Sequence, residues 1–201
     1  MSDSKRKSAL TTRELTTVAI LAAISAVLFM IEIPVVLFYK LDFSNLPVLL
    51  GTFAMGPLPG TLILLVKSLL GLLHTSSQGV GELADFLMGA AMVLPAGFLY
   101  RRRKTRKEAI LGMSAGTLAA TAAGVLSNVF LLIPFYGAVY HLPVEQIVAM
   151  GQSIFPAIQN EWGFVMLITA PFNLLKWVLI SVLTALLYKP LSPILHGMRR
   201  P

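Results

Sequence analysis

The chain has 201 residues, of which 56% are hydrophobic and 12% are charged, about half of the roughly 25% of charged residues in typical soluble domains. A small soluble protein needs polar residues to cover its large surface. This composition therefore excludes a small soluble protein. The absence of cysteine excludes disulfides and thiolate sites. The net charge is +7, but most of the basic residues flank apolar segments, which argues against a nucleic-acid-binding patch.

The first apolar segment predicts a membrane-spanning helix over residues 13–33, which ends before Pro34. It has the length of about 20 mainly apolar residues that a bilayer requires. No small-residue cleavage motif follows it, so we interpret it as a retained span and not as a signal peptide. The segment also carries small residues four positions apart, which allow another helix, from the same protein or from a partner, to approach closely: Ala19, Ala22, Ala23 and Ala26.

An external loop over residues 34–44 precedes two shorter apolar segments. These segments cover residues 45–55 and 61–74 and flank the turn sequence GPLPG. Each is shorter than a simple membrane span. Together they predict a hairpin of tilted or partial helices.

Three long apolar segments complete the pattern: residues 81–100, 108–133 and 163–188. Pro134 and Pro190 are expected to end the last two helices. The external stretch of residues 134–160 contains a predicted surface helix over residues 144–150. The prediction is therefore an all-α integral membrane bundle of six transmembrane helices, which forms a single domain over residues 1–201 in a cell membrane.

Basic residues gather in three segments that six spans would place on one side of the membrane: Lys5, Arg6, Lys7 and Arg13; Arg101, Arg102, Arg103, Lys104, Arg106 and Lys107; and Lys189, Arg199 and Arg200. Most acidic residues lie near the opposite ends of the predicted spans. Because cytoplasmic loops carry the excess of Lys and Arg, both termini are predicted to be cytoplasmic.

Four polar or charged side chains fall within predicted spans, where such groups are costly and usually mark a site: Lys67, Asn128, Asn173 and Lys176. Asn173 and Lys176 are three residues apart on one helix face, and they offer donors and an acceptor to a ligand with hydroxyls, carbonyls or negative charge. The alternative is that these groups hold helices together. We favour a ligand site for this pair and the structural role for Lys67.

Two other patterns could carry chemistry. Residues 112–116, GMSAG, match the nucleophile-elbow pattern around Ser114, but no base can be placed beside it, and close helix packing explains it better. His74, Glu82 and Asp85 are a poor set of metal ligands, and we interpret the two acids as partners of a helix dipole. Neither a metal site nor a Walker A site for ATP is predicted.

Residues 40–51, KLDFSNLPVLLG, closely resemble the pattern K-[LV]-D-F-S-x-[IL]-P-x-L-[LI]-G of riboflavin-specific substrate-binding subunits of energy-coupling factor transporters. The resemblance continues in residues 53–60, FAMGPLPG, in residues 81–86, GELADF, and at Asn173 and Lys176. With the length and the six-span pattern included, it covers most of the chain.

The resemblance implies a membrane-embedded binding subunit that is not an enzyme and has no cofactor of its own. Such a subunit captures riboflavin outside the cell, and a transmembrane coupling subunit and two ATPase subunits drive its uptake. The loop after the first helix would cover the ligand, and the alanines of the first span would dock on the coupling subunit. The residues that match the family's substrate contacts are Lys40, Leu41, Asp42, Asn128, Asn173 and Lys176.

The sequence leaves three other functions open. The chain could be a binding subunit for another vitamin, such as thiamine, folate or pantothenate. It could be an intramembrane hydrolase that uses Ser114, or a channel or carrier that works without ATPase partners.

Overall fold

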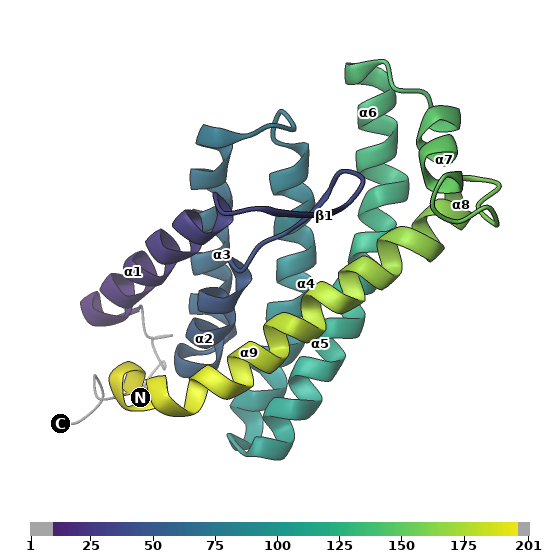
Figure 1. The fold of residues 1–201 in the computed structure, drawn as a ribbon. Coiled ribbons are helices and arrows are strands. Elements are labelled where there is room, and N and C mark those ends of the chain that lie inside the picture. Colours follow the sequence, from purple (N-terminus) through teal and green to yellow (C-terminus); the bar gives the residue numbers. More distant parts are fainter. Residues whose placement is uncertain (1–9, 197–201) are drawn as a thin grey trace, which may run out of the picture.

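The computed structural model describes residues 10–196 of the chain, with side chains to residue 191, and this part is mainly helical (Figure 1). The α-helices are α1 (Thr12–Phe29), α2 (Asn45–Met55), α3 (Pro57–Gly71), α4 (Val80–Arg103), α5 (Arg106–Ser127), α6 (Ile133–Tyr140), α7 (Val144–Gln152), α8 (Glu161–Phe164) and α9 (Ala170–His196). A 3-10 turn, η1 (Leu72–His74), and two π-helical segments, η2 (Asn128–Leu132) and η3 (Val165–Thr169), continue these helices. The predicted basic signals Lys5, Arg6, Lys7, Arg199 and Arg200 lie outside the described residues.

Five helical runs in residues 10–196 are long and apolar enough to cross a membrane: Thr12–Phe29, Pro57–His74, Val80–Arg103, Arg106–Tyr140 and Glu161–Leu191. The predicted second span is α2, which has 11 residues and is too short to cross a bilayer alone. Nearly all of α2 is buried, and it packs against α1, α3, α4 and α9. The structure thus has a short internal helix where the hydropathy pattern predicts one of six spans.

The turn between α2 and α3 is shorter than the sequence GPLPG predicts. Gly56 alone makes the turn with φ of 108°, a backbone conformation that favours glycine. Pro57 then begins α3, because the first turn of a helix does not need the missing N–H. The two helices lie in close contact, since a Cβ on Gly60 would come within 2.0 Å of Thr52 Oγ1.

The expectation that prolines end the last two long helices is wrong. Pro134 and Pro171 each follow a π-helical segment, in which the N–H of Ile133 and of Ala170 bonds to a carbonyl five residues earlier. The wider π turn accommodates a proline ring that would clash with the carbonyl four residues before it. The helix therefore continues from α5 through η2 to α6, and α9 continues past Pro190.

Residues of the predicted external loop form a small β-hairpin, which the all-α prediction missed. Strands β1 (Ile33–Val36) and β2 (Tyr39–Leu41) pair antiparallel, with Ile33 opposite Leu41. The strands are short, and an irregularity at Pro34 to Val36 follows from the N–H that proline lacks. The hairpin crosses one end of the bundle and reaches from α1 toward α6 and α9 (Figure 1).

Within the described residues, the buried side chains form two apolar clusters. One lies among α1, α2, α3, α4, α5 and α9 and includes Phe53 and Trp177. The other joins the hairpin to η2, α7, α8 and η3 through Tyr39 and Phe164. Since the hairpin contributes Tyr39 to this second cluster, its position is fixed by side-chain packing and not only by the two strands.

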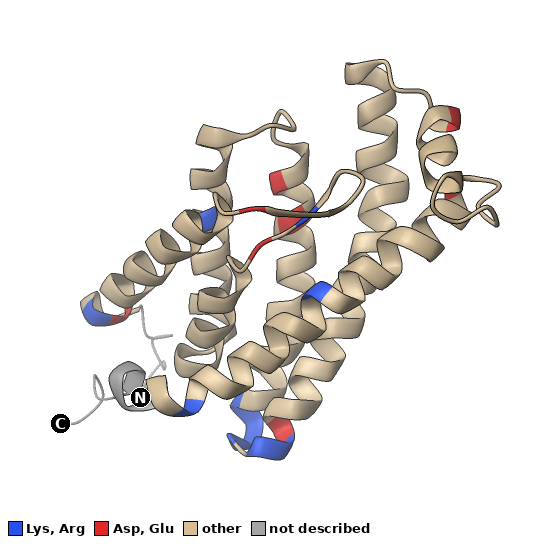
Figure 2. Cartoon of the chain, viewed as in Figure 1, with Lys and Arg blue, Asp and Glu red and all other residues tan. Residues whose placement is uncertain are grey.

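Most of the described basic residues outside the bundle interior lie toward one end of the bundle (Figure 2). Arg13, the α4–α5 connection and Lys189 lie at one end, which we call the basic end. The hairpin and the start of α4 carry acidic residues at the opposite end, which we call the hairpin end.

Candidate binding site

A cavity of about 170 Å³ lies beneath the β-hairpin. The hairpin, the start of α4, η2 and α9 all contribute to its lining. A second cavity of about 520 Å³ adjoins it, because the two share Phe29, Glu32, Lys40, Ser76 and Glu82. Sites for drug-sized ligands have volumes of about 300–1,000 Å³. Such a ligand would therefore fill the first cavity and extend toward the second.

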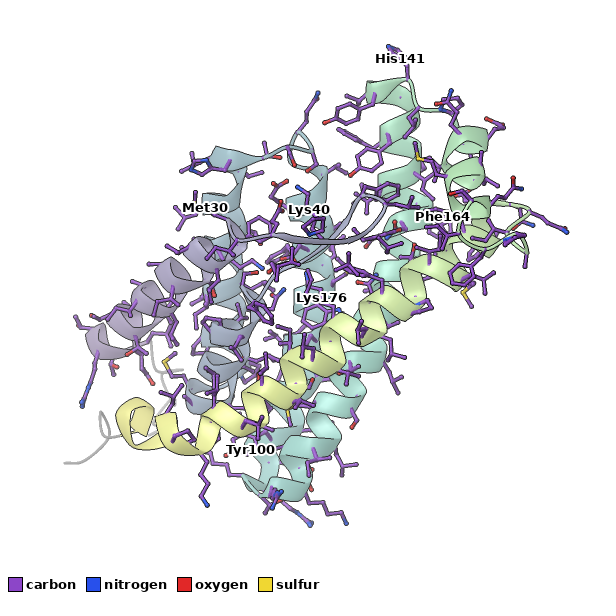
Figure 3. The ribbon with its side chains drawn as sticks, in the orientation of Figure 1. Met30, Lys40, Tyr100, His141, Phe164 and Lys176 are labelled. Carbon is purple, nitrogen blue, oxygen red and sulfur yellow. The ribbon has the colours of Figure 1, made fainter. Side chains whose placement is uncertain are left out.

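Two carboxylates and two ammonium groups form a buried cluster at this cavity, and three of the four residues, among them Lys176 (Figure 3), contribute to its lining. Lys67 Nζ of α3 lies 2.5 Å from Asp85 Oδ2 of α4. Lys176 Nζ of α9 lies 2.8 Å from Asp42 Oδ2 and 3.4 Å from Asp85 Oδ1. All four side chains are at most 7% exposed. We call them the ion-pair quartet; its formal charges cancel, as buried charges require.

Hydrogen bonds extend the ion-pair quartet into the start of α2. Lys67 Nζ donates to Ser44 Oγ at 2.8 Å and to Asn45 Oδ1 at 3.2 Å. Ser44 in turn donates to Asp42 Oδ1 through its backbone N–H and its hydroxyl. Asn45 Nδ2 donates to Asp85 Oδ1. The residue after the hairpin, Asp42, is therefore tied to three helices of the bundle.

Amide side chains line the cavity beside the quartet. The Tyr39 hydroxyl of the hairpin donates to Asn128 Oδ1 at 2.8 Å. Because that hydroxyl has a single hydrogen, the hydroxyl of Thr169 is the donor in its short hydrogen bond with Tyr39. Burial raises the pKa of Tyr39, so the hydroxyl keeps the hydrogen that it donates.

Asn128 is the first residue of η2, and Asn173 lies one turn after the end of η3. Asn128 Nδ2 donates to the Gly124 carbonyl at 2.9 Å, and Asn173 Nδ2 donates to the Thr169 carbonyl at 3.0 Å. Each amide nitrogen has a second hydrogen, and both residues line the cavity. Two oriented amides thus lie at one site beside the two π-helical segments. Such segments are frequent at functional sites.

Aromatic rings close the cavity on the side of the hairpin. Phe38 lies 6.0 Å from Phe164 between ring centroids, and Tyr39 lies 5.1 Å from Phe172. Tyr39 and Phe172 also line the cavity. The arrangement can cover a flat aromatic ligand while amides and charges contact its polar edge.

Residues 13–188 match the family described as ECF transporter, substrate-specific component. The chain belongs to this family. Its helices and apolar surface are therefore those of a membrane transporter component and not of an enzyme.

Several relatives of this substrate-specific component cover nearly the same length. The riboflavin transporter RibU of Staphylococcus aureus (strain TCH60) is 33% identical over 184 residues, which is 90% of each chain. The riboflavin transporter FmnP of Bacillus subtilis (strain 168) is 26% identical and covers 93% of this chain and 96% of that one. A solved structure described as the S component of a bacterial ECF transporter has a TM-score of 0.72 and 32% identity, and covers 94% of this chain and 98% of that chain.

The structure of this substrate-specific component brings five of the six predicted contact residues to one cavity: Lys40, Asp42, Asn128, Asn173 and Lys176. Leu41 is half-buried in β2 and is not part of the lining. Lys40 lines the rim, where its ammonium pairs with Glu32 and is well exposed. Asp42 and Asp85 bind Lys176, which leaves one of the three N–H donors of its ammonium for a ligand.

The predicted contact residues leave out one member of the ion-pair quartet that lines the cavity, Asp85, whereas Lys67, for which a structural role is predicted, does not line it. Asp85 lies beyond the first turn of α4 and binds two lysines, so the interpretation as a partner of the helix dipole is wrong for it. Glu82 does lie in that first turn and accepts hydrogen bonds from Thr75 and Ser77. The signal for Asp85 was Lys67: a buried lysine requires a buried carboxylate.

The remaining predicted residues divide between core and surface. Ala22 is fully buried in the apolar core and cannot contact a partner, whereas Ala19 and Ala23 are exposed and Ala26 is half-buried. The GMSAG sequence is a packing motif of α5, since a Cβ on Gly116 would lie 2.6 Å from the Met92 carbonyl oxygen of α4. Ser114 is on the exposed side of that helix.

Proposed function

We propose that this chain is the riboflavin-binding, substrate-specific component of an ATP-driven energy-coupling factor transporter. The observation that carries the proposal is the cavity under the hairpin, whose lining includes Asn128, Asn173, three members of the ion-pair quartet and several aromatic rings. Relatives named riboflavin transporters, which match about nine-tenths of the chain, support the same ligand.

The chemistry of riboflavin matches this lining. Its flat ring system would lie against Tyr39 and Phe172, and its polar edge would accept from and donate to Asn128 and Asn173. The ribityl hydroxyls would meet the polar lining on the side of Glu82. Each hydrogen bond contributes only about 0.5–1.5 kcal/mol net, so burial of the ring beneath the hairpin must supply most of the affinity.

Transport requires partners that this chain would bind in the membrane. We infer that a transmembrane coupling subunit and two ATPase subunits drive release, with the hairpin end outside the cell. Both termini and the basic end would then be cytoplasmic, since the start of α1, the α4–α5 connection and the C-terminal part of α9 lie toward the same end of the bundle. In this arrangement α2 is the sixth membrane segment, and the loop of residues 34–44, which contains most of the hairpin, is the lid.

An absorbance spectrum of the detergent-purified protein tests the ligand. We expect flavin bands close to one equivalent per chain, released as riboflavin on denaturation, or quenching of added riboflavin fluorescence if the site is empty. A colourless preparation that fails to quench would reject riboflavin. Competition by thiamine, folate or pantothenate would then identify a rival vitamin.

Reconstitution without partners separates a binding subunit from a self-sufficient carrier. Liposomes that contain this chain alone should bind riboflavin without sustained uphill uptake. Uphill uptake by the chain alone would contradict the proposed dependence on ATPase subunits.

Replacement of Asn173 by alanine should weaken riboflavin binding by about 1–3 kcal/mol, because the ligand's polar edge would lose a buried partner. Fluorescence titration measures the change. The control is Gln152→Ala, which removes an exposed amide from α7 outside the cavity. Equal affinity of Asn173→Ala and the wild type would remove Asn173 from the site.

Replacement of Ala19 by tryptophan should spare riboflavin binding and reduce assembly with the coupling subunit, since Ala19 is exposed on α1. Ala22→Trp is the matched control: Ala22 is buried, so this change should destabilise the bundle itself. Co-purification with the coupling subunit and ligand titration measure the two effects. Normal assembly of Ala19→Trp would place the partner surface elsewhere.

A further inference from the structure

A long groove between α5 and α9 lies outside the proposed riboflavin site. It consists of two hollows of about 620 Å³ and about 460 Å³, which share Ile110, Met113 and Ala185. The two helices cross obliquely (Figure 1), and the hydroxyls of Thr117 and Ser181 meet at 3.2 Å in its lining. None of the residues that line the groove lines the cavity under the hairpin.

The groove is about as long as one leaflet of a bilayer is deep. On α5 its lining runs from Arg106 to Leu118, which at 1.5 Å per residue is about 18 Å. Half of the hydrocarbon core of a bilayer measures about 15 Å. A single acyl chain of a membrane lipid therefore fits the groove in length.

The two ends of the groove differ in chemistry. Arg106, Lys189 and the hydroxyl-bearing Tyr100 and Tyr188 line the part at the basic end. Toward the middle of the membrane the lining includes Leu118, Val178 and Val182, which are 66%, 45% and 50% exposed. A groove that is cationic at one end and apolar at the other complements a lipid with an anionic headgroup and an apolar acyl chain.

Arg106 and Lys189 are available to such a headgroup. Both are exposed, and within the side chains that the structure describes neither forms an ion pair with a carboxylate. Arg106 is at the first position of α5, in a connection where Arg101, Arg102, Arg103, Lys104 and Lys107 raise the local positive potential. Such clusters beside membrane helices attract anionic lipids.

We propose that this groove binds one anionic phospholipid, with its phosphate between Arg106 and Lys189 and one acyl chain along α5 and α9 as far as Leu118. Small residues permit this position: Ser114 and Ala185 leave room for a chain between the larger side chains of the two helices. The lipid would cover apolar surface that the crossing of α5 and α9 leaves open. The inference does not depend on the identity of the transported ligand.

Native mass spectrometry of the full chain in detergent tests the proposal by titration with phosphatidylglycerol and with phosphatidylcholine of the same acyl chains. We expect the wild type to bind phosphatidylglycerol about tenfold more tightly, because the choline ammonium of phosphatidylcholine offsets its phosphate charge and is repelled by Arg106 and Lys189. The double variant Arg106→Gln/Lys189→Gln should lose this preference. The control Arg102→Gln/Arg103→Gln, with the same loss of charge outside the groove, should keep it.

A second variant tests the tail end without changing charge. Ala185→Trp fills the groove where the two hollows join and should weaken phosphatidylglycerol binding by about tenfold. Unfolding of each variant in mixed micelles with increasing SDS reports whether the bundle is folded. Equal binding of both lipids by the wild type, or unchanged binding by the double variant, would overturn the proposal. So would competition by glycerol 3-phosphate as strong as that by the lipid, since the acyl chain would then contribute nothing.

Discussion

Replacement of Lys67 by methionine is expected to lower the free energy of unfolding by about 3–5 kcal/mol, because it leaves an uncompensated carboxylate in the interior. Lys67 is fully buried, and its ammonium contacts Asp85, Ser44 and Asn45. Methionine has a similar length, so the loss of charge and hydrogen bonds dominates the effect. Reversible unfolding in mixed micelles with increasing SDS measures the change.

Two further variants separate the effect of breaking the buried ion pair from the general effect of removing a lysine charge. Lys67→Met combined with Asp85→Asn removes both charges of the closest pair, and should recover part of the lost stability, although Lys176 then keeps only Asp42. Lys40→Met breaks the exposed pair with Glu32 and should cost less than about 1 kcal/mol. A loss of the same size for Lys67→Met and Lys40→Met would show that burial does not determine the cost.

The pattern of hydrophobicity and charge predicted most of the bundle. The apolar segments correspond to helices, and the basic segments within the described residues lie together at one end. Local rules could not predict that the helices continue past Pro134 and Pro190. A proline ends a helix only where the backbone cannot adjust so that the carbonyls before it avoid the ring and find other hydrogen-bond donors. At Pro134 the π-helical segment η2 supplies that arrangement.

The sequence predicted most of the residues at the candidate site but not the contacts among them. Asn128, Asn173 and Lys176 were found because polar groups are rare in apolar helices. The sequence did not indicate that Lys176 pairs with Asp42, since 134 positions separate the two residues in the chain. The partner of Tyr39 could not be predicted for a related reason: the sequence around a tyrosine in a loop does not indicate that its hydroxyl bonds to Asn128.

Replacement of Lys176 by methionine should weaken riboflavin binding by about 2–4 kcal/mol, or about 30- to 1,000-fold. The lysine acts twice in the proposed site. It lines the cavity, and it anchors Asp42, the residue that follows the hairpin. The variant would therefore lose a charged group beside the ligand and a contact that holds the lid closed. Fluorescence titration measures the affinity, and unfolding in SDS shows whether the bundle remains folded.

Asp42→Asn separates these two roles of Lys176. It weakens the anchor of the hairpin, while Lys176 keeps its charge and its contact with Asp85. If the anchor holds the lid over riboflavin, Asp42→Asn should raise the dissociation rate by about tenfold or more and change the association rate little. If Lys176 acts only through its charge beside the ligand, Asp42→Asn should leave the dissociation rate near that of the wild type. A fall in the association rate alone would contradict both roles, because it would indicate a lid that fails to open.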